Sequence, residues 1–222
     1  MFLGHYAMAL GAKKAVPKIS LGTLFLAAQF VDLLWPLLLL LGIEHVRIDP
    51  GNTAVTPLDF YDYPFTHSLT GALVWSILVG GAFYAIRRNN KGAIALGVVA
   101  FSHWVLDFLT HRPDLPLAFG EGPRFGLGLW DSVAGTVIVE VGLFFAGTAL
   151  YAKTTRALDR IGSFGFWTLI GVLSAIYLAN LFGPPPPDVR AIGVAGNALW
   201  LFVIWGYWVD RHRVAAQSGA LI

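Results

Sequence analysis

The sequence predicts an all-α fold, a polytopic membrane bundle of six transmembrane helices plus a short N-terminal membrane helix. Of its 222 residues 56% are hydrophobic and only 13% are charged, about half the charged share of a soluble domain. A helix needs about 20 mostly apolar residues to cross the hydrocarbon core of a bilayer. Six runs meet this length: 20–42, 67–86, 92–110, 129–151, 163–182 and 191–209.

The remaining apolar segment, residues 2–15, would form a helix of about 21 Å, which crosses only part of the hydrocarbon. Acids and histidines lie within the runs before residue 151, whereas the last two runs contain none. We therefore predict one integral membrane domain over residues 1–222, with site-bearing helices in 1–151 and supporting helices in 152–222.

The basic residues predict the orientation of the chain. Eleven of the fifteen lie at alternate ends of the predicted spans: Lys13, Lys14, Lys18, Arg87, Arg88, Lys91, Lys153, Arg156, Arg160, Arg211 and Arg213. The positive-inside rule places these residues and the C-terminus in the cytoplasm, with loops 43–66 and 111–128 outside. No basic face is left over for nucleic acid. The chain has no cysteine, which excludes disulfides and thiolate metal ligands.

The stretch SHWVLDFLTH places His103, Asp107 and His111 at four-residue spacings, on one face of a helix. An ionisable group inside a membrane costs several kcal/mol unless it is paired, hydrated or bound to an ion. Measured from the cytoplasmic ends of their helices, His5, Asp32, His103 and Asp107 lie at depths of about 12, 18, 16 and 22 Å. His67 opens its span at the outer face. These five groups therefore share the outer half of the membrane, as the ligands of one ion must.

Imidazole and carboxylate donors suit zinc, or iron or manganese, and the set has too few oxygens for calcium. We interpret His5, His67, His103 and Asp107 as ligands, and Asp32 as a ligand or a general base. Pro36 cannot donate to the Asp32 carbonyl, so the helix is expected to kink at that acid. Pro64 with Thr66 or Ser68 predicts a helix start beside His67.

Each residue also has a structural interpretation. A lone membrane histidine such as His5 is more often a packing residue, and His103 with Asp107 can be a hydrogen-bonded pair. Three further groups are candidates for supporting the site. His111 either supports it or lies at the interface, and Asp131 can be an N-cap for the fourth span. Glu140 is a proton relay or a buried, protonated acid.

Four motifs over residues 1–131 make the chain resemble the bacterial inner-membrane metal-dependent hydrolase family. They are Gly4-His5, Asp32, Thr66-His67-Ser68-Leu69, and Ser102-His103 followed by Asp107. The resemblance implies a location in the bacterial inner membrane and hydrolytic chemistry at a divalent metal.

Our leading hypothesis is an intramembrane zinc-dependent hydrolase, with Asp32 and Asp107 as its catalytic carboxylates. Because the site lies within the membrane, its expected partners are membrane lipid and a lipid or lipid-linked substrate. One alternative is a transporter in which the same groups line an ion or proton path. Another is a metal-stabilised membrane scaffold without turnover, which differs from an enzyme in having no open coordination position.

Overall fold

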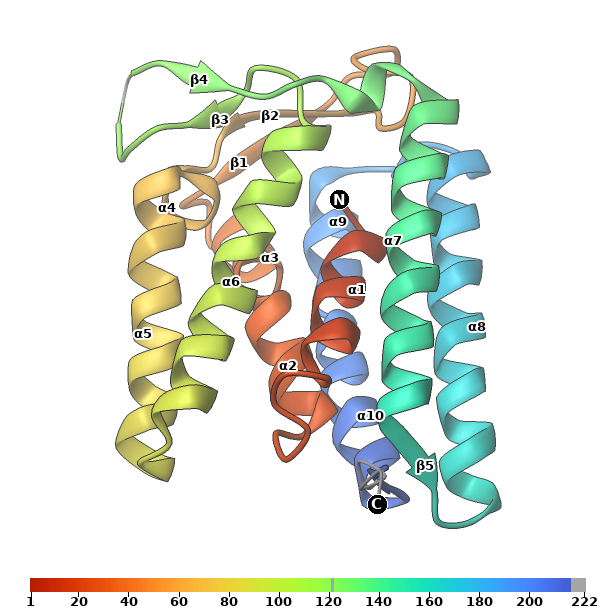
Figure 1. Ribbon diagram of the computed structural model, residues 1–222. Helices are drawn as coiled ribbons and strands as arrows, with labels where there is room; N and C mark the ends of the chain where they lie inside the picture. Colours follow the sequence, from red (N-terminus) through yellow and green to blue (C-terminus); the bar gives the residue numbers. More distant parts are fainter. Residues whose placement is uncertain (121, 217–222) are drawn as a thin grey trace.

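The computed structural model describes residues 1–120 and 122–216, which form a helical bundle with short two-stranded sheets at both ends (Figure 1). The helices are α1 (Leu3–Ala12), α2 (Leu21–Ala28), α3 (Phe30–Leu40), α4 (Pro64–His67), α5 (Leu69–Arg87), α6 (Asn90–Thr110), η1 (Leu129–Asp131), α7 (Val133–Thr154), α8 (Arg160–Phe182), α9 (Val189–Gly196) and α10 (Leu199–Arg211). The strands are β1 (His45–Ile48), β2 (Leu58–Asp62), β3 (Leu115–Pro116), β4 (Arg124–Phe125), β5 (Thr155–Ala157) and β6 (Arg213–Ala215).

Among the described residues, five helical segments are long and apolar enough to cross a membrane: α5, α6, α7, α8 and the α9–α10 segment Val189–Arg211. The pair α2–α3 passes the same test together but is bent by 55°. The predicted count of six spans therefore requires this bent pair to cross as one. The short N-terminal helix is present as α1, whose 10 residues extend about 15 Å. These helices fit a multi-pass membrane protein.

The prediction of a kink at Asp32 was wrong by about one turn. The helix is interrupted at Gln29, which separates α2 from α3, and α3 continues through Pro36 with Asp32 in its first turn. The ring of Pro36 fits against α9 at Gly196, where a Cβ would come within 2.6 Å of it. Glycine at position 196 of the neighbouring helix thus leaves room for the proline ring.

Helix α1 lies in the interior of the bundle, against α7 and α6 (Figure 1). Its side chains Tyr6 and Leu10 are almost fully buried. The closest approach to α7 is at Gly147, where a Cβ would lie 2.5 Å from the carbonyl oxygen of Ala7. This contact requires glycine and fixes the position of the helix that carries His5.

The two loops predicted to lie outside both contain antiparallel hairpins. Strands β1 and β2 pair in one, and β3 and β4 in the other, at the same end of the bundle (Figure 1). Asp59 on β2 pairs with Arg47 of β1 and with Arg112, just after α6. These ion pairs attach the β1–β2 hairpin to the end of α6. Strands β5 and β6, which are separated in the sequence by α8, α9 and α10, pair antiparallel at the opposite end, near the described end of the chain.

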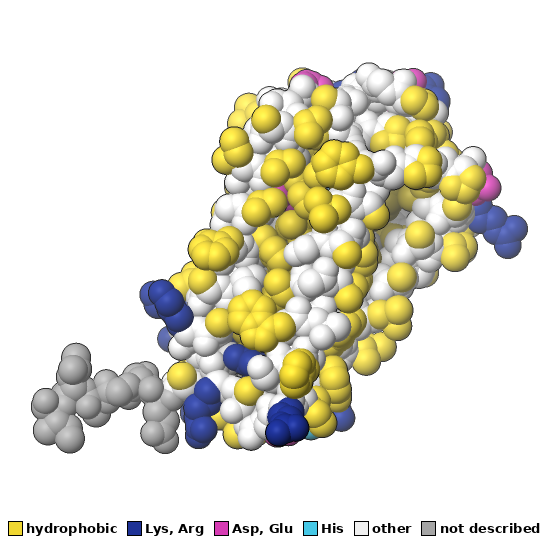
Figure 2. Space-filling view, turned by 90° about the vertical axis from the view of Figure 1, so that its right-hand side faces the viewer, with side chains coloured by type: hydrophobic (Ala, Val, Ile, Leu, Met, Phe, Trp, Pro, Cys, Tyr) yellow, Lys and Arg dark blue, Asp and Glu magenta, His cyan; other side chains and the backbone are white. Residues whose placement is uncertain are grey.

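Hydrophobic side chains cover the middle of the visible face in Figure 2, and Lys and Arg side chains lie mostly toward its lower end. Large apolar residues on several long helices are exposed, including Ile77, Ile138, Phe145, Phe164 and Phe182, each at 70% or more. Such a surface is costly in water and suits contact with lipid.

Candidate metal centre

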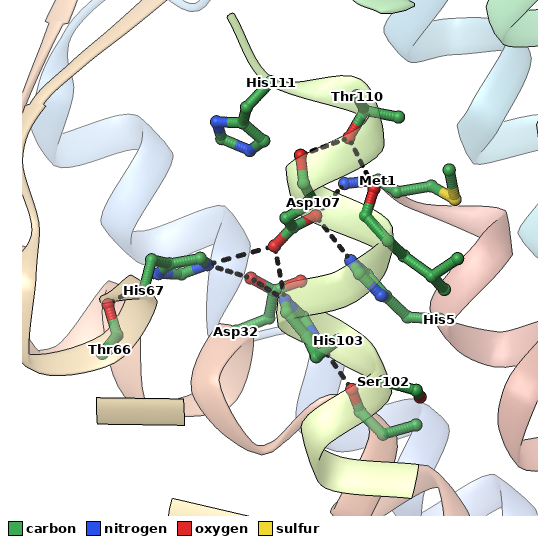
Figure 3. Close-up of polar contacts among 12 residues, drawn as sticks. Met1, His5, Asp32, Thr66, His67, Ser102, His103, Asp107, Thr110 and His111 are labelled. Atoms are coloured by element: carbon green, nitrogen blue, oxygen red, sulfur yellow. Dashed lines mark hydrogen bonds and ion pairs between the residues drawn. The ribbon is translucent and has the colours of Figure 1, made fainter. Parts of the chain in front are cut away.

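Five side chains from four helices meet in the half of the bundle nearer to β1–β4 (Figure 3). His5 comes from α1, Asp32 from the first turn of α3, His67 from the end of α4, and His103 and Asp107 from successive turns of α6. Within the described residues, two groups can each hold a metal ion: His5 with His103 and Asp107, and Asp32 with His67 and His103. His103 belongs to both groups.

Two imidazole nitrogens and two carboxylate oxygens lie close together in the site. His67 Nε2 lies 3.3 Å from Asp32 Oδ1 and 3.8 Å from Asp107 Oδ2. His103 Nε2 lies 3.5 Å from the same Asp32 oxygen and 3.1 Å from the same Asp107 oxygen. Atoms bonded tetrahedrally at about 2.0–2.2 Å are separated by roughly 3.3–3.6 Å. The four separations are close to this range, and His103 is the residue through which the two groups meet.

The hydrogen bond of His103 shows which of its nitrogens faces the site. Its Nδ1 lies 2.7 Å from the carbonyl oxygen of Ala28, which can only accept, so Nδ1 carries a proton. Its buried Nε2 has no hydrogen-bond partner among the described residues. In the neutral ring this nitrogen presents a lone pair toward two carboxylate oxygens, an arrangement that a cation between them would stabilise.

His5 reaches the site through the other oxygen of Asp107. Its Nε2 lies 3.1 Å from Asp107 Oδ1, and its ring stacks on that of His103 with centroids 3.5 Å apart and planes 8° apart. The Met1 amino nitrogen donates to the same oxygen over 2.6 Å (Figure 3). Asp107 is therefore contacted at both oxygens, with Oδ2 directed toward His67 and His103.

Exposure distinguishes Asp32 from the other four residues. Its side chain is 26% exposed, whereas those of His5, His67, His103 and Asp107 are at most 8% exposed. The site is therefore accessible from the side of Asp32 and buried on the sides of the other four residues.

The three supporting candidates lie outside both metal-holding groups of the described residues. His111 follows α6, and its Nδ1 lies 2.9 Å from Asp114 Oδ1 while its ring packs against Trp130. Tyr63 donates to the same Asp114 oxygen over 2.8 Å, and burial raises the pKa of this phenol well above its ordinary value. His111 thus belongs to a hydrogen-bonded cluster beneath the hairpins.

Asp131 and Glu140 lie near helix N-termini and not among the metal-holding groups of the described residues. Asp131 is exposed, and the N-cap of α7 is its neighbour Ser132, whose side chain accepts from Gly135. The suggestion that Asp131 caps this helix was therefore wrong by one residue. Glu140 Oε2 accepts from the backbone nitrogens of Phe2 and Gly4, so it caps the N-terminus of α1 from the neighbouring helix.

Sequence reasoning missed Glu44, which is fully buried and bonded to Thr66 beside His67. In the sequence it is one of several acids in a long loop, and no spacing connects it to the site. Thr66 did carry a signal, since it precedes His67 in the motif Thr-His-Ser-Leu.

No protein-family model, curated protein or solved structure matches the chain. The resemblance to the inner-membrane hydrolase family therefore stays a prediction from the motifs, and the functional argument depends on the geometry of the site.

Proposed function

We propose that this chain is an intramembrane metal-dependent hydrolase that acts on a lipid or lipid-linked substrate. The observation that carries the proposal is the approach of two imidazole Nε2 atoms, from His67 and His103, to the same two carboxylate oxygens of Asp32 and Asp107 in an almost dry interior. A divalent cation between these groups would offset the repulsion of the two buried carboxylates and use the imidazole lone pairs.

Zinc is the ion that we propose. Its four-coordinate preference allows three protein ligands with a fourth position for water, and the spacing of the imidazole nitrogens and carboxylate oxygens is compatible with its bond lengths. Iron and manganese accept the same donor types, so the choice between them is experimental.

The residues have distinct proposed roles in hydrolysis. A divalent ion at this site would polarise an ester or phosphoryl oxygen and lower the pKa of water to about 7. His67, His103 and Asp107 would hold that ion, and His5 contacts the other oxygen of Asp107, which orients this carboxylate. Asp32, on the accessible side, would accept the proton of the attacking water.

The lipid-like substrate is inferred from the surroundings of the site. The long helices around it expose large apolar side chains along their length, and the hairpins β1–β2 and β3–β4 cover the nearer end of the bundle (Figures 1 and 2). A substrate with an acyl or isoprenoid chain can approach between such helices from the bilayer. Glu140 caps α1, so it does not extend the group toward the opposite end as a transport path would require.

The test begins with purified protein in lipid nanodiscs, stripped by chelation and reloaded separately with Zn²⁺, Mn²⁺ or Fe²⁺. Metal content is measured by mass spectrometry, and hydrolysis is screened with chromogenic carboxylic and phosphoric esters that carry long acyl chains. We expect about one ion per chain and hydrolysis that disappears on chelation and returns with one metal. Tight metal binding without turnover of either ester class would favour the scaffold, and absence of binding would overturn the proposal.

A further inference from the structure

Glu44 lies in the turn between α3 and β1, and its side chain connects that turn to the start of α4. Its Oε1 accepts from the backbone nitrogens of Phe65 and Thr66, at 2.7 and 2.9 Å. Its Oε2 accepts from the hydroxyl of Thr66 at 2.6 Å. Glu44 and Thr66 are both fully buried. One carboxylate therefore caps a four-residue helix and also holds the side chain next to His67.

The hydrogen bonds have only one consistent direction. Three donors point to the two oxygens of Glu44, so both oxygens act as acceptors. The Thr66 hydroxyl has a single proton, which it gives to Glu44. Its contact with His67 Nδ1, at 2.7 Å, must then be a bond that Nδ1–H donates and Thr66 Oγ1 accepts (Figure 3). In the neutral ring the free lone pair is therefore on Nε2, the atom that faces Asp32 and Asp107.

We propose that Glu44, acting through Thr66, is a positioning residue that fixes the tautomer and ring direction of His67. The proposal rests on the proposed function of the metal centre. It identifies Glu44 and Thr66 as the residues that hold the ring of His67 from the side away from the metal. Metal-binding imidazoles usually donate their second nitrogen to an oxygen acceptor. His103 uses the backbone carbonyl of Ala28 for this purpose, whereas His67 uses a hydroxyl backed by a buried carboxylate.

If Glu44 only capped α4 and did not position His67, substitutions of Thr66 and Glu44 would have different effects on His67. Thr66→Val keeps the backbone bonds to Glu44 and removes only the hydroxyl. It therefore separates the hydrogen-bonded chain Glu44–Thr66–His67, called the relay below, from the capping of α4 by Glu44. Thr66→Ser keeps the hydroxyl. In Glu44→Gln the amide can donate to Thr66, which frees the Thr66 proton to point at His67 Nδ1 and moves the His67 proton to Nε2. A relay is sensitive to Thr66→Val and Glu44→Gln, whereas a cap tolerates Thr66→Val.

The first experiment needs no metal. Protein labelled with ¹⁵N-histidine is placed in lipid and the Nδ1–H signal of His67, identified by its absence in His67→Ala, is followed by NMR. We expect a hydrogen-bonded Nδ1 proton in the wild type and in Thr66→Ser, and its loss or a marked shift in Thr66→Val. The same signal in the wild type and Thr66→Val would overturn the proposal.

The second experiment titrates the stripped protein with Co²⁺ and follows its visible absorption. We expect the dissociation constant to rise about 10- to 100-fold in Thr66→Val and Glu44→Gln and to stay near wild type in Thr66→Ser. Equal affinities in Thr66→Val and Thr66→Ser would overturn the role at the metal. If wild type binds no Co²⁺, the proposed function fails, and the NMR signal alone decides whether the relay exists.

Asp210→Asn is the matched control. Asp210 also accepts a backbone N–H, from Leu21 at 2.7 Å, and a hydroxyl, from Tyr151 at 2.7 Å, and it forms an additional ion pair with Lys13. It lies at the opposite end of the bundle from Glu44. This variant is expected to lose stability while its Co²⁺ affinity and the His67 signal stay at wild-type values. A comparable loss of affinity in this control would show that general destabilisation explains the effect, and the proposal would be withdrawn.

Discussion

The Nδ1 of His103 lies 2.7 Å from the carbonyl oxygen of Ala28, the last residue of α2 before the chain bends into α3. The carbonyls of the last turn of a helix have no partner within that helix, so they are available to side chains. The same bend starts α3 at Phe30 and brings Asp32 Oδ1 to 3.5 Å from the other nitrogen of His103. One interruption of a helix therefore provides two contacts for a single imidazole.

Replacing His103 should remove metal and stability together. His103→Ala deletes a member of both metal-holding groups, so the binding energy of the ion no longer stabilises the fold. At a metal concentration 100 times the dissociation constant this stabilisation is about 2.7 kcal/mol, or roughly 5–10 °C in Tm for a chain of this size. Metal analysis and thermal unfolding of the purified variant measure both effects.

His212→Ala is the control for that variant, because His212 pairs with Asp159 at the other end of the bundle. It should keep its metal and its metal-dependent increase in Tm. If His103→Ala retained one metal ion per chain, the ion would be bound at a site that does not include His103.

Asp32→Asn should separate proton transfer from metal binding. If Asp32 serves as the general base, the variant keeps its ion through His67, His103 and Asp107 and has nearly wild-type Tm. Its hydrolytic rate should fall by a factor of about 10² or more, as expected for a missing proton acceptor. Metal content and turnover are measured on the same preparation. A metal-free Asp32→Asn variant would instead make Asp32 a ligand, which its 3.3 Å distance from His67 also allows.

Gly147→Ala should loosen the packing of α1 against α7. The new Cβ would lie 2.5 Å from the carbonyl oxygen of Ala7, so one helix must move, at a cost of about 1–3 kcal/mol. Thermal unfolding should show a lower Tm than wild type. Gly142→Ala on the same helix is the control, since no described atom lies within 4 Å of its Cβ position. Equal Tm values for the two variants would contradict the packing argument.

The orientation in the membrane can be tested by cysteine labelling, because the chain has no cysteine of its own. Ala54 lies in the β1–β2 hairpin and Asn89 between α5 and α6, and both are exposed. In intact cells an impermeant maleimide should label Ala54→Cys, and should label Asn89→Cys only after permeabilisation. The reverse labelling pattern would show that the true topology is opposite to the predicted one, with the site in the cytoplasmic half of the membrane.

The sequence alone determined the helical character of the chain and predicted that its ionisable groups share one level along the bundle. Long apolar runs predict helices long enough to cross a membrane, and such helices are present as α5 to α8 and the α9–α10 segment. Residue count along a helix fixes axial position at about 1.5 Å per residue, so a shared depth for His5, Asp32, His103 and Asp107 could be predicted.

Only the tertiary structure decided how these groups face one another. Rotation of a helix about its axis and the site of a bend depend on packing with neighbours, which no single run of residues encodes. Packing placed the break at Gln29, directed the two oxygens of Asp107 to different partners, and left Asp131 in the exposed turn η1. It also brought Glu44 to Thr66 across 22 positions of sequence, a contact that depends on the path of the intervening β1–β2 hairpin and therefore on the whole fold.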